Sequence, residues 1–288
     1  MKQLALGGFV VLLLLVGPCI AATGEAGGIS PFLESWNNIA YYGTNVERQG
    51  FSSLLGQLQG KVGLTLFAVP LQVYGAYYCT ASQSPDYWDN CLFYGPGIRF
   101  RPLANYPPQG WLDAWLPDLK IFVESLSASY LKDAASGEVN RRIDLRYGFD
   151  LWHEWNLDKP DYSQFWGELW SNLSYRSTNF SWTDFNGDIF YFQPKLGRHL
   201  GNGIEAYLKA DLTMSSKNDY WLNVGDYGLG LRFEPWRSAY KADEDSLLKK
   251  FKMFAEVLGV SYLKDKPTDP QKTVASDVRF GIDFSYGR

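Results

Sequence analysis

The two histidines of this 288-residue chain are the residues with most scope for acid–base chemistry. A histidine beside a serine can accept its proton and turn the hydroxyl into a nucleophile. His199 lies in "HLGNG", where Gly201 stands two residues on, and His153 lies in "LWHEW". Neither has a serine two residues on, although Ser174 or Ser177 from another segment leaves this chemistry open.

No sequence motif in the chain indicates binding of a metal, a phosphate group or a nucleic acid. "GNG" after Leu200 is typical of a turn, and no Walker, Rossmann or zinc-ligand spacing occurs. Two histidines and few cysteines make a metal site a poor expectation. The net charge of −4 offers no basic surface for nucleic acid. We expect no cofactor, no metal and no nucleic-acid partner.

Cys79 and Cys91 flank the polar stretch "TASQSPDYWDN". In an oxidising compartment, such a pair is predicted to form a disulfide that closes one hairpin loop. Two unlinked thiols are the alternative.

The end of the chain shows strict alternation. In "SDVRFGIDFSYGR", Val278, Phe280 and Ile282 alternate with Asp277 and Arg279. Period-two alternation is typical of a β-strand whose side chains point to opposite faces. One face is apolar and aromatic, and the other is charged.

The same alternation recurs in segments bounded by Gly, Pro, Asn, Asp and Ser. Twelve strands are predicted, near 36–46, 54–69, 71–81, 91–102, 119–131, 142–155, 166–182, 186–198, 203–214, 221–234, 251–263 and 277–287.

The chain is also internally duplicated. "YGPGIRFRPL" from Tyr94 and "YGLGLRFEPW" from Tyr227 begin 133 residues apart. "DLRYGFDL" from Asp144 returns as "DVRFGIDF" from Asp277 at the same separation. The repeat halves cover about 36–155 and 166–288, with six predicted strands each. A repeat of this length suits half of one closed structure rather than a solenoid.

The first residues indicate export. Residues 1–22 carry Lys2, an apolar run and small residues near Ala22, as a cleavable signal peptide does. An uncleaved membrane anchor is the alternative. Residues 23–288 then form one domain.

Composition supports a membrane barrel over a soluble β-sandwich. Aromatic residues make up 17% of the chain, as aromatic girdles require, while the mean hydropathy is −0.23. Only alternate strand residues of a barrel need be apolar, so both values fit. We predict an all-β, antiparallel, up-and-down transmembrane β-barrel of about twelve strands in a bacterial outer membrane.

The last strand resembles the C-terminal assembly signal of bacterial outer-membrane proteins. The residues that carry this resemblance are Arg279, Gly281, Phe284 and Tyr286. It implies recognition by the barrel-assembly machinery, although Gly287 and one further residue follow the final aromatic.

A second resemblance covers most of the second half. "FWGELWSNLSYRSTNFSW", "FQPKLGRHLG", "IEAYLKADL" and "YGLGLRFEP" resemble the barrels of phage-adsorption proteins and exopolysaccharide secretins. It implies a non-enzymatic role in envelope or exopolysaccharide export, with a separate periplasmic or inner-membrane partner. A surface receptor without a transport role is one alternative. The other is an outer-membrane acyl hydrolase or deacylase, whose His-x-Ser-Asn signature is not matched at His199.

If the apolar face meets lipid, the polar face lines the lumen. The lumen candidates have mixed signs, as either a polar conduit or an interior closed by paired charges would have. They are Arg99, Arg101, Lys120, Glu124, Asp144, Arg146, Asp150, Glu205, Lys209, Asp211, Arg232, Glu234, Lys252, Glu256, Asp277, Arg279 and Asp283.

Overall fold

A computed structural model describes the strands and part of their connections. The described residues are 28–44, 52–66, 70–83, 89–110, 113–132, 143–157, 165–179, 186–219, 222–236, 250–264 and 275–287. The predicted signal peptide lies outside them. Within these ranges, no helix has the length and apolar character to span a membrane.

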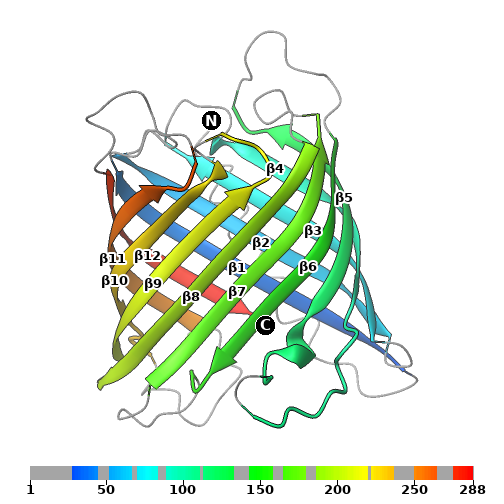
Figure 1. Ribbon diagram of the computed structural model, residues 1–288, viewed down its shortest axis with the longest axis horizontal. Helices are drawn as coiled ribbons and strands as arrows, with labels where there is room; N and C mark the ends of the chain where they lie inside the picture. The colour runs from blue at the N-terminus through cyan, green and yellow to red at the C-terminus, as the bar shows by residue number, and fades with distance from the viewer. Residues whose placement is uncertain are drawn as a thin grey trace.

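Twelve strands form a single closed antiparallel barrel. They wind obliquely around a common axis (Figure 1). In chain order they are β1 (Ile29–Thr44), β2 (Ser52–Leu66), β3 (Leu71–Ser82), β4 (Cys91–Phe100), β5 (Lys120–Tyr130), β6 (Ile143–Trp155), β7 (Phe165–Thr178), β8 (Asn186–Gly201), β9 (Ile204–Ser215), β10 (Val224–Phe233), β11 (Phe251–Tyr262) and β12 (Ala275–Tyr286).

Each strand pairs with its sequence neighbours, and β12 returns to pair with β1. The closing register sets Asn38 opposite Asp283 and Ala40 opposite Gly281. This pairing removes the two sheet edges, which would otherwise leave backbone groups unsatisfied in lipid. The predicted twelve-stranded, up-and-down barrel is therefore confirmed.

The first strand begins earlier than predicted, at Ile29 rather than near residue 36. Pro31 made this segment a poor strand candidate, because proline has no backbone N–H to donate. In the structure, Pro31 pairs with Leu64 of β2, whereas the pairing of β1 with β12 starts only at Ser35. Proline is tolerated there because β1 has a neighbour on one side only.

Alternation along the strands separates two faces. In β10, Leu229 and Leu231 are exposed, whereas Gly230 and Arg232 are buried. In β12, Val278 and Phe280 are exposed while Asp277 and Arg279 are buried. The apolar face is outside and the charged face is inside, the arrangement of a barrel in lipid.

The "GNG" stretch forms the turn between β8 and β9, as its composition predicts. Asn202 and Gly203 both have positive φ, at 51° and 74°. These residue types tolerate the left-handed region, so the turn can be short.

The connection between β4 and β5 is longer and contains the short 3-10 helix η3 (Leu116–Asp118). Asp113 accepts backbone hydrogen bonds from Gln109 at 2.9 Å and Gly110 at 2.8 Å. The hydroxyl of Tyr106 also donates to Asp113, at 3.1 Å. These bonds give the connection a defined local structure outside the barrel wall.

Candidate functional site

The lumen holds most of the polar side chains that the sequence places there. Those on inward strand positions are Arg99, Lys120, Glu124, Asp144, Arg146, Asp150, Glu205, Lys209, Asp211, Arg232, Lys252, Glu256, Asp277, Arg279 and Asp283. Glu234 follows the end of β10 and lies buried, 3.7 Å from the Nζ of Lys252.

Arg101 is the exception, and its placement in the lumen is wrong. β4 ends at Phe100, so strand alternation no longer sets the direction of the next side chain. Arg101 instead donates to the carbonyl of Pro117 at 3.0 Å and lies 3.6 Å from Asp118. It belongs to the β4–β5 connection.

In the first half, Arg99 on β4 reaches Glu34 on β1, three strands away around the barrel. Its two terminal nitrogens donate to the Glu34 carboxylate at 2.9 and 2.6 Å, and its Nε donates to Gln72 at 2.7 Å. Only 1% of Arg99 is exposed. A bidentate pair of this kind fixes both distance and orientation.

Glu124 is the second centre of the first half. It accepts hydrogen bonds from the hydroxyls of Tyr74 at 3.0 Å and Tyr78 at 2.9 Å. The Nζ of Lys61 lies 3.1 Å from the same carboxylate. The buried charge is thus both neutralised and hydrogen-bonded, as burial requires.

The second half repeats the Arg99 arrangement at Arg232. Arg232 contacts Glu168 at 2.5 Å and Glu205 at 2.6 Å, and it is 3% exposed. Glu168 is also 3.4 Å from the Nζ of Lys195. Trp166 packs against the Arg232 guanidinium, 4.3 Å from its ring centroid.

The Glu124 arrangement recurs in part at Glu256. Glu256 accepts a hydrogen bond from Tyr207 at 2.8 Å and one from Lys209 at 3.0 Å. Lys209 also contacts Asp211 at 3.0 Å. The two halves therefore share the tyrosine–glutamate contact but not the lysine, because Lys209 stands where the first half has Ala76, and Lys195, the equivalent of Lys61, contacts Glu168.

The duplicated sequence accounts for this equivalence. Partners recur at offsets of 132 to 134 residues: Glu34 with Glu168, Lys61 with Lys195, Gln72 with Glu205, Tyr74 with Tyr207, Arg99 with Arg232, and Glu124 with Glu256. Sequence reasoning missed Glu34, Lys61, Glu168 and Lys195, although their recurrence at one offset was a signal that could have identified them.

Arg146 and Arg279 are equivalent in sequence but differ in their contacts. Arg146 donates to Asp144 at 2.7 Å. Arg279 contacts three carboxylates, with Asp277 at 2.6 Å, Asp226 at 2.7 Å and Asp211 at 3.1 Å. Phe93 and Tyr78, which pack around Arg146, stand where the second half has Asp226 and Asp211.

The histidines have separate environments. His199 is buried and its Nδ1 lies 2.7 Å from Glu205, in the Arg232 network. His153 lies at the end of β6, where its Nδ1 is 2.7 Å from Asp118 of η3. Ser174 donates to Asn172 at 3.0 Å, which is not the serine–histidine contact that nucleophile activation needs.

The predicted disulfide between Cys79 and Cys91 is wrong, because the two residues are not joined. In the pairing of β3 with β4, Cys91 lies opposite Thr80, and Cys79 lies opposite Leu92. Side chains one residue out of register point to opposite faces of the sheet. A disulfide needs its two side chains on one face.

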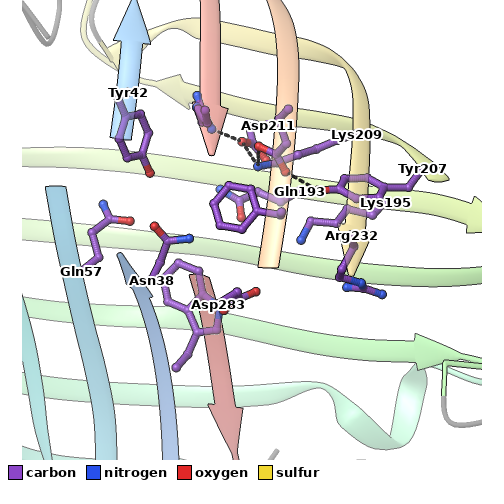
Figure 2. Close-up of a pocket in the computed structure, with 14 residues that line it drawn as sticks. Asn38, Tyr42, Gln57, Gln193, Lys195, Tyr207, Lys209, Asp211, Arg232 and Asp283 are labelled. Carbon is purple, nitrogen blue, oxygen red and sulfur yellow. Dashed lines mark hydrogen bonds and ion pairs between the residues drawn. The ribbon is translucent and has the colours of Figure 1, made fainter. Parts of the chain in front are cut away.

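A polar cavity of about 100 Å³ lies within the lumen. Asn38 and Gln57 stand on one side of it, and Lys209, Asp211 and Arg232 stand on the other (Figure 2). A polar space of this size is large enough to hold water. The cavity is lined by residues of β8 to β12, in the second half, together with residues of β1 and β2.

The outer surface of the barrel exposes apolar side chains. Exposed side chains on the outer face include Val123, Val257, Leu208, Leu229 and Phe280. A closed barrel with an apolar outside and a polar inside is built for a bilayer rather than for water. The protein is accordingly a β-barrel of the bacterial outer membrane.

Solved structures with similar folds are outer-membrane barrels. The KdgM porin is 10% identical, with a TM-score of 0.35, and the match covers 88% of this chain and 99% of that one. An anion-selective porin from Comamonas acidovorans is 11% identical, with a TM-score of 0.33 and coverage of 90% and 100%. The translocator domain of the autotransporter NalP from Neisseria meningitidis is 10% identical, with a TM-score of 0.32 and coverage of 99% and 96%.

No protein-family model and no curated protein matches the chain. The function must therefore be argued from the lumen itself.

Proposed function

We propose that this protein is a non-enzymatic outer-membrane barrel that is closed at rest and serves as a membrane-embedded component of envelope or exopolysaccharide export. The observation that supports a closed state is the burial of the charged side chains in the lumen. Arg99 is 1% exposed, Glu124 is 2% exposed and Glu205 is 0% exposed. Charges that lined an open aqueous pore would contact water instead.

The paired geometry supports a scaffold more than an open conduit. Buried ion pairs resist separation, because removing one partner leaves an uncompensated charge in a medium of low dielectric constant. Both Arg99 and Arg232 are held by carboxylates from a strand three positions away around the barrel. The cavity, at about 100 Å³, leaves little room for a polymer in this state.

The export role rests on the resemblance of the second half to the barrels of phage-adsorption proteins and exopolysaccharide secretins. The partners proposed with it are lipid, the barrel-assembly machinery and a periplasmic or inner-membrane export component. The hydroxyl of Ser174 donates to Asn172 rather than to a histidine, which supports a non-enzymatic role over acyl hydrolysis.

Two measurements test the proposal separately. In planar bilayers, the refolded wild-type protein should show no steady conductance, whereas a general porin measured in parallel should conduct. Steady conductance from well-folded protein would overturn the closed state.

For the export role, cells that lack the gene should secrete less surface polysaccharide, and the wild-type gene should restore it. A variant with Phe284→Ala and Tyr286→Ala, which should not assemble, serves as the matched control. Unchanged polysaccharide in the deletion strain would overturn the export role but not the closed barrel.

A further inference from the structure

Asn38 and Asp283 form an incomplete polar pair beside the lumen cavity. They lie opposite each other on β1 and β12, and Gln57 lies opposite Asn38 on β2. All three line the cavity, and only 8% of Asn38 is exposed. Among the described residues, neither the Oδ1 of Asn38 nor the Oδ1 of Asp283 has a hydrogen-bond partner. Buried acceptors of this kind are costly unless something satisfies them.

The duplication supplies a completed copy of the same pair. Asn172 and Asp150 stand at the equivalent positions and also face each other, on β7 and β6. Asp150 accepts hydrogen bonds from Trp170 at 3.2 Å and from Asn172 at 3.5 Å. Ser174 donates to the Oδ1 of Asn172 at 3.0 Å.

One substitution between the halves explains part of the difference. The residue equivalent to Ser174 in the first half is Ala40, which has no hydroxyl to donate to Asn38. Asn38 therefore lacks the donor that satisfies Asn172. Asp211, on the opposite wall of the cavity, has a further Oδ1 without a hydrogen-bond partner in the described structure.

The charges around the cavity are unbalanced as well. Four cations line the cavity: Lys195, Lys209, Arg232 and Arg279. The carboxylates that line it or lie within 3.4 Å of one of these cations are Glu168, Glu205, Asp211, Asp226, Glu256, Asp277 and Asp283. Carboxylates exceed cations by three. A protonated His199 beside Glu205 would still leave two in excess.

The adjoining ion pairs do not change this excess. Lys252 and Glu234 lie next to this group, with their charged atoms 3.7 Å apart. Because they add one cation and one carboxylate, the excess of carboxylates stays the same. Negative charge in excess and unsatisfied oxygens thus coincide at the one cavity described above.

We propose that the Asn38–Asp283 side of this cavity binds a small monovalent cation of the Na⁺ or K⁺ kind. Carboxylate, amide carbonyl and water oxygens are the ligands such hard cations take. The volume of about 100 Å³ accommodates an ion with one or two waters. No group of three His, Cys, Asp or Glu fit to hold a metal ion occurs in the part of the chain described, which favours a singly charged ion.

This site does not depend on the export role, because a closed lumen can hold an ion without conducting it. The test uses the full-length barrel folded in detergent. Its thermal unfolding is followed by heat-modifiable gel mobility in the chlorides of Na⁺, K⁺ and N-methyl-D-glucamine at equal ionic strength. Binding to the folded state alone should raise the unfolding temperature with Na⁺ or K⁺ by on the order of 5 °C at saturation.

Asp283→Asn and Asn38→Ala should each abolish this cation dependence. Asp150→Asn, the matched change in the completed copy, should keep it. Direct binding is measured with Tl⁺, whose NMR line should broaden with the wild type and not with Asp283→Asn. Equal unfolding temperatures in all three salts, or Tl⁺ binding retained by a folded Asp283→Asn protein, would each overturn the proposal.

Discussion

Arg99 and Glu34 tie together two strands that are not hydrogen-bonded neighbours. Arg99 is on β4 and Glu34 is on β1, yet their charged atoms lie 2.6 Å apart across the inside of the barrel. Arg232 on β10 and Glu168 on β7 make the same chord in the second half. Each half of the barrel thus has one ion pair that links two non-neighbouring strands on the inside of the wall.

Reversal of a lumen charge should cost more stability at Arg279 than at Arg146. Arg279→Glu places a fourth carboxylate among Asp211, Asp226 and Asp277, whereas Arg146→Glu faces Asp144. Loss of a buried pair costs about 3–5 kcal/mol, and Arg279→Glu should lose at least this much. Urea titration of the barrel in lipid vesicles measures the free energy of unfolding.

A restoring exchange serves as the control. Asp144→Arg in the Arg146→Glu background recreates the pair with its charges swapped and should recover part of the lost stability. If both single reversals folded with wild-type stability and altered ion selectivity, the lumen charges would be solvated and the closed interior would be wrong.

Gly281→Ala should weaken the seam between β1 and β12. A Cβ at Gly281 would lie 2.3 Å from the carbonyl oxygen of Ile39, which is backbone and cannot move aside easily. We expect a loss of roughly 1–3 kcal/mol, the range for overpacking. Gly75→Ala is the matched control, because nothing lies within 4 Å of a Cβ there. Equal unfolding curves for the two variants would contradict the prediction.

Phe284→Ala and Tyr286→Ala together should impair assembly while secretion to the periplasm continues. The two changes remove the proposed assembly signal, and Phe284 also packs on Phe251 with ring centroids 4.9 Å apart. Ser285→Ala, on the opposite face of β12, should assemble normally. Heat-modifiable mobility of membrane fractions is the measurement, and normal mobility of the double variant would count against the signal.

Topology follows from strand parity. The start of β1 and the end of β12 lie at the same end of the barrel as the β4–β5 connection, and the β3–β4 connection lies at the other end. We expect the first end to face the periplasm. In a background without native cysteines, Gln83→Cys, at an exposed position of the β3–β4 connection, should react with an impermeant thiol reagent on intact cells, and Gly110→Cys should react only after permeabilisation. The reverse pattern would show the opposite orientation.

The β4–β5 connection should loosen at acid pH. Backbone donation from Gln109, together with Gly110 and Tyr106, lowers the pKa of Asp113 below its ordinary value of 3.8. A lowered pKa means that the stabilising contribution is present above pH 3.8 and is lost as the pH falls through the folded-state pKa. Limited proteolysis should cut this connection faster at pH 2 than at pH 6, whereas Asp113→Asn should show a smaller difference. A cleavage ratio unchanged by the substitution would refute this.

The sequence by itself determined the strands, their two faces and the twofold plan of the chain. Period-two alternation is a local property, so Leu229 and Arg232 could be assigned to opposite faces of the wall without knowledge of the fold. Recurrence at one offset predicted that Arg99 and Arg232, or Arg146 and Arg279, would hold corresponding places. The start of β1 was missed because Pro31 obscured it, and only the one-sided pairing there shows why proline is tolerated.

Tertiary structure alone decided which charges meet. Alternation directs a side chain into the lumen, but its partner depends on the stagger of strands that can be several positions apart, as with Arg99 and Glu34. The same stagger places Cys79 and Cys91 on opposite faces, although their spacing in sequence suggested a disulfide. It also places Asn38 and Asp283 beside a cavity, whereas Asn172 donates to Asp150 and accepts from Ser174. The change from Ser174 to Ala40 between the halves is visible in the sequence, but the cavity beside Asn38 arises only when the neighbouring strands are packed in space.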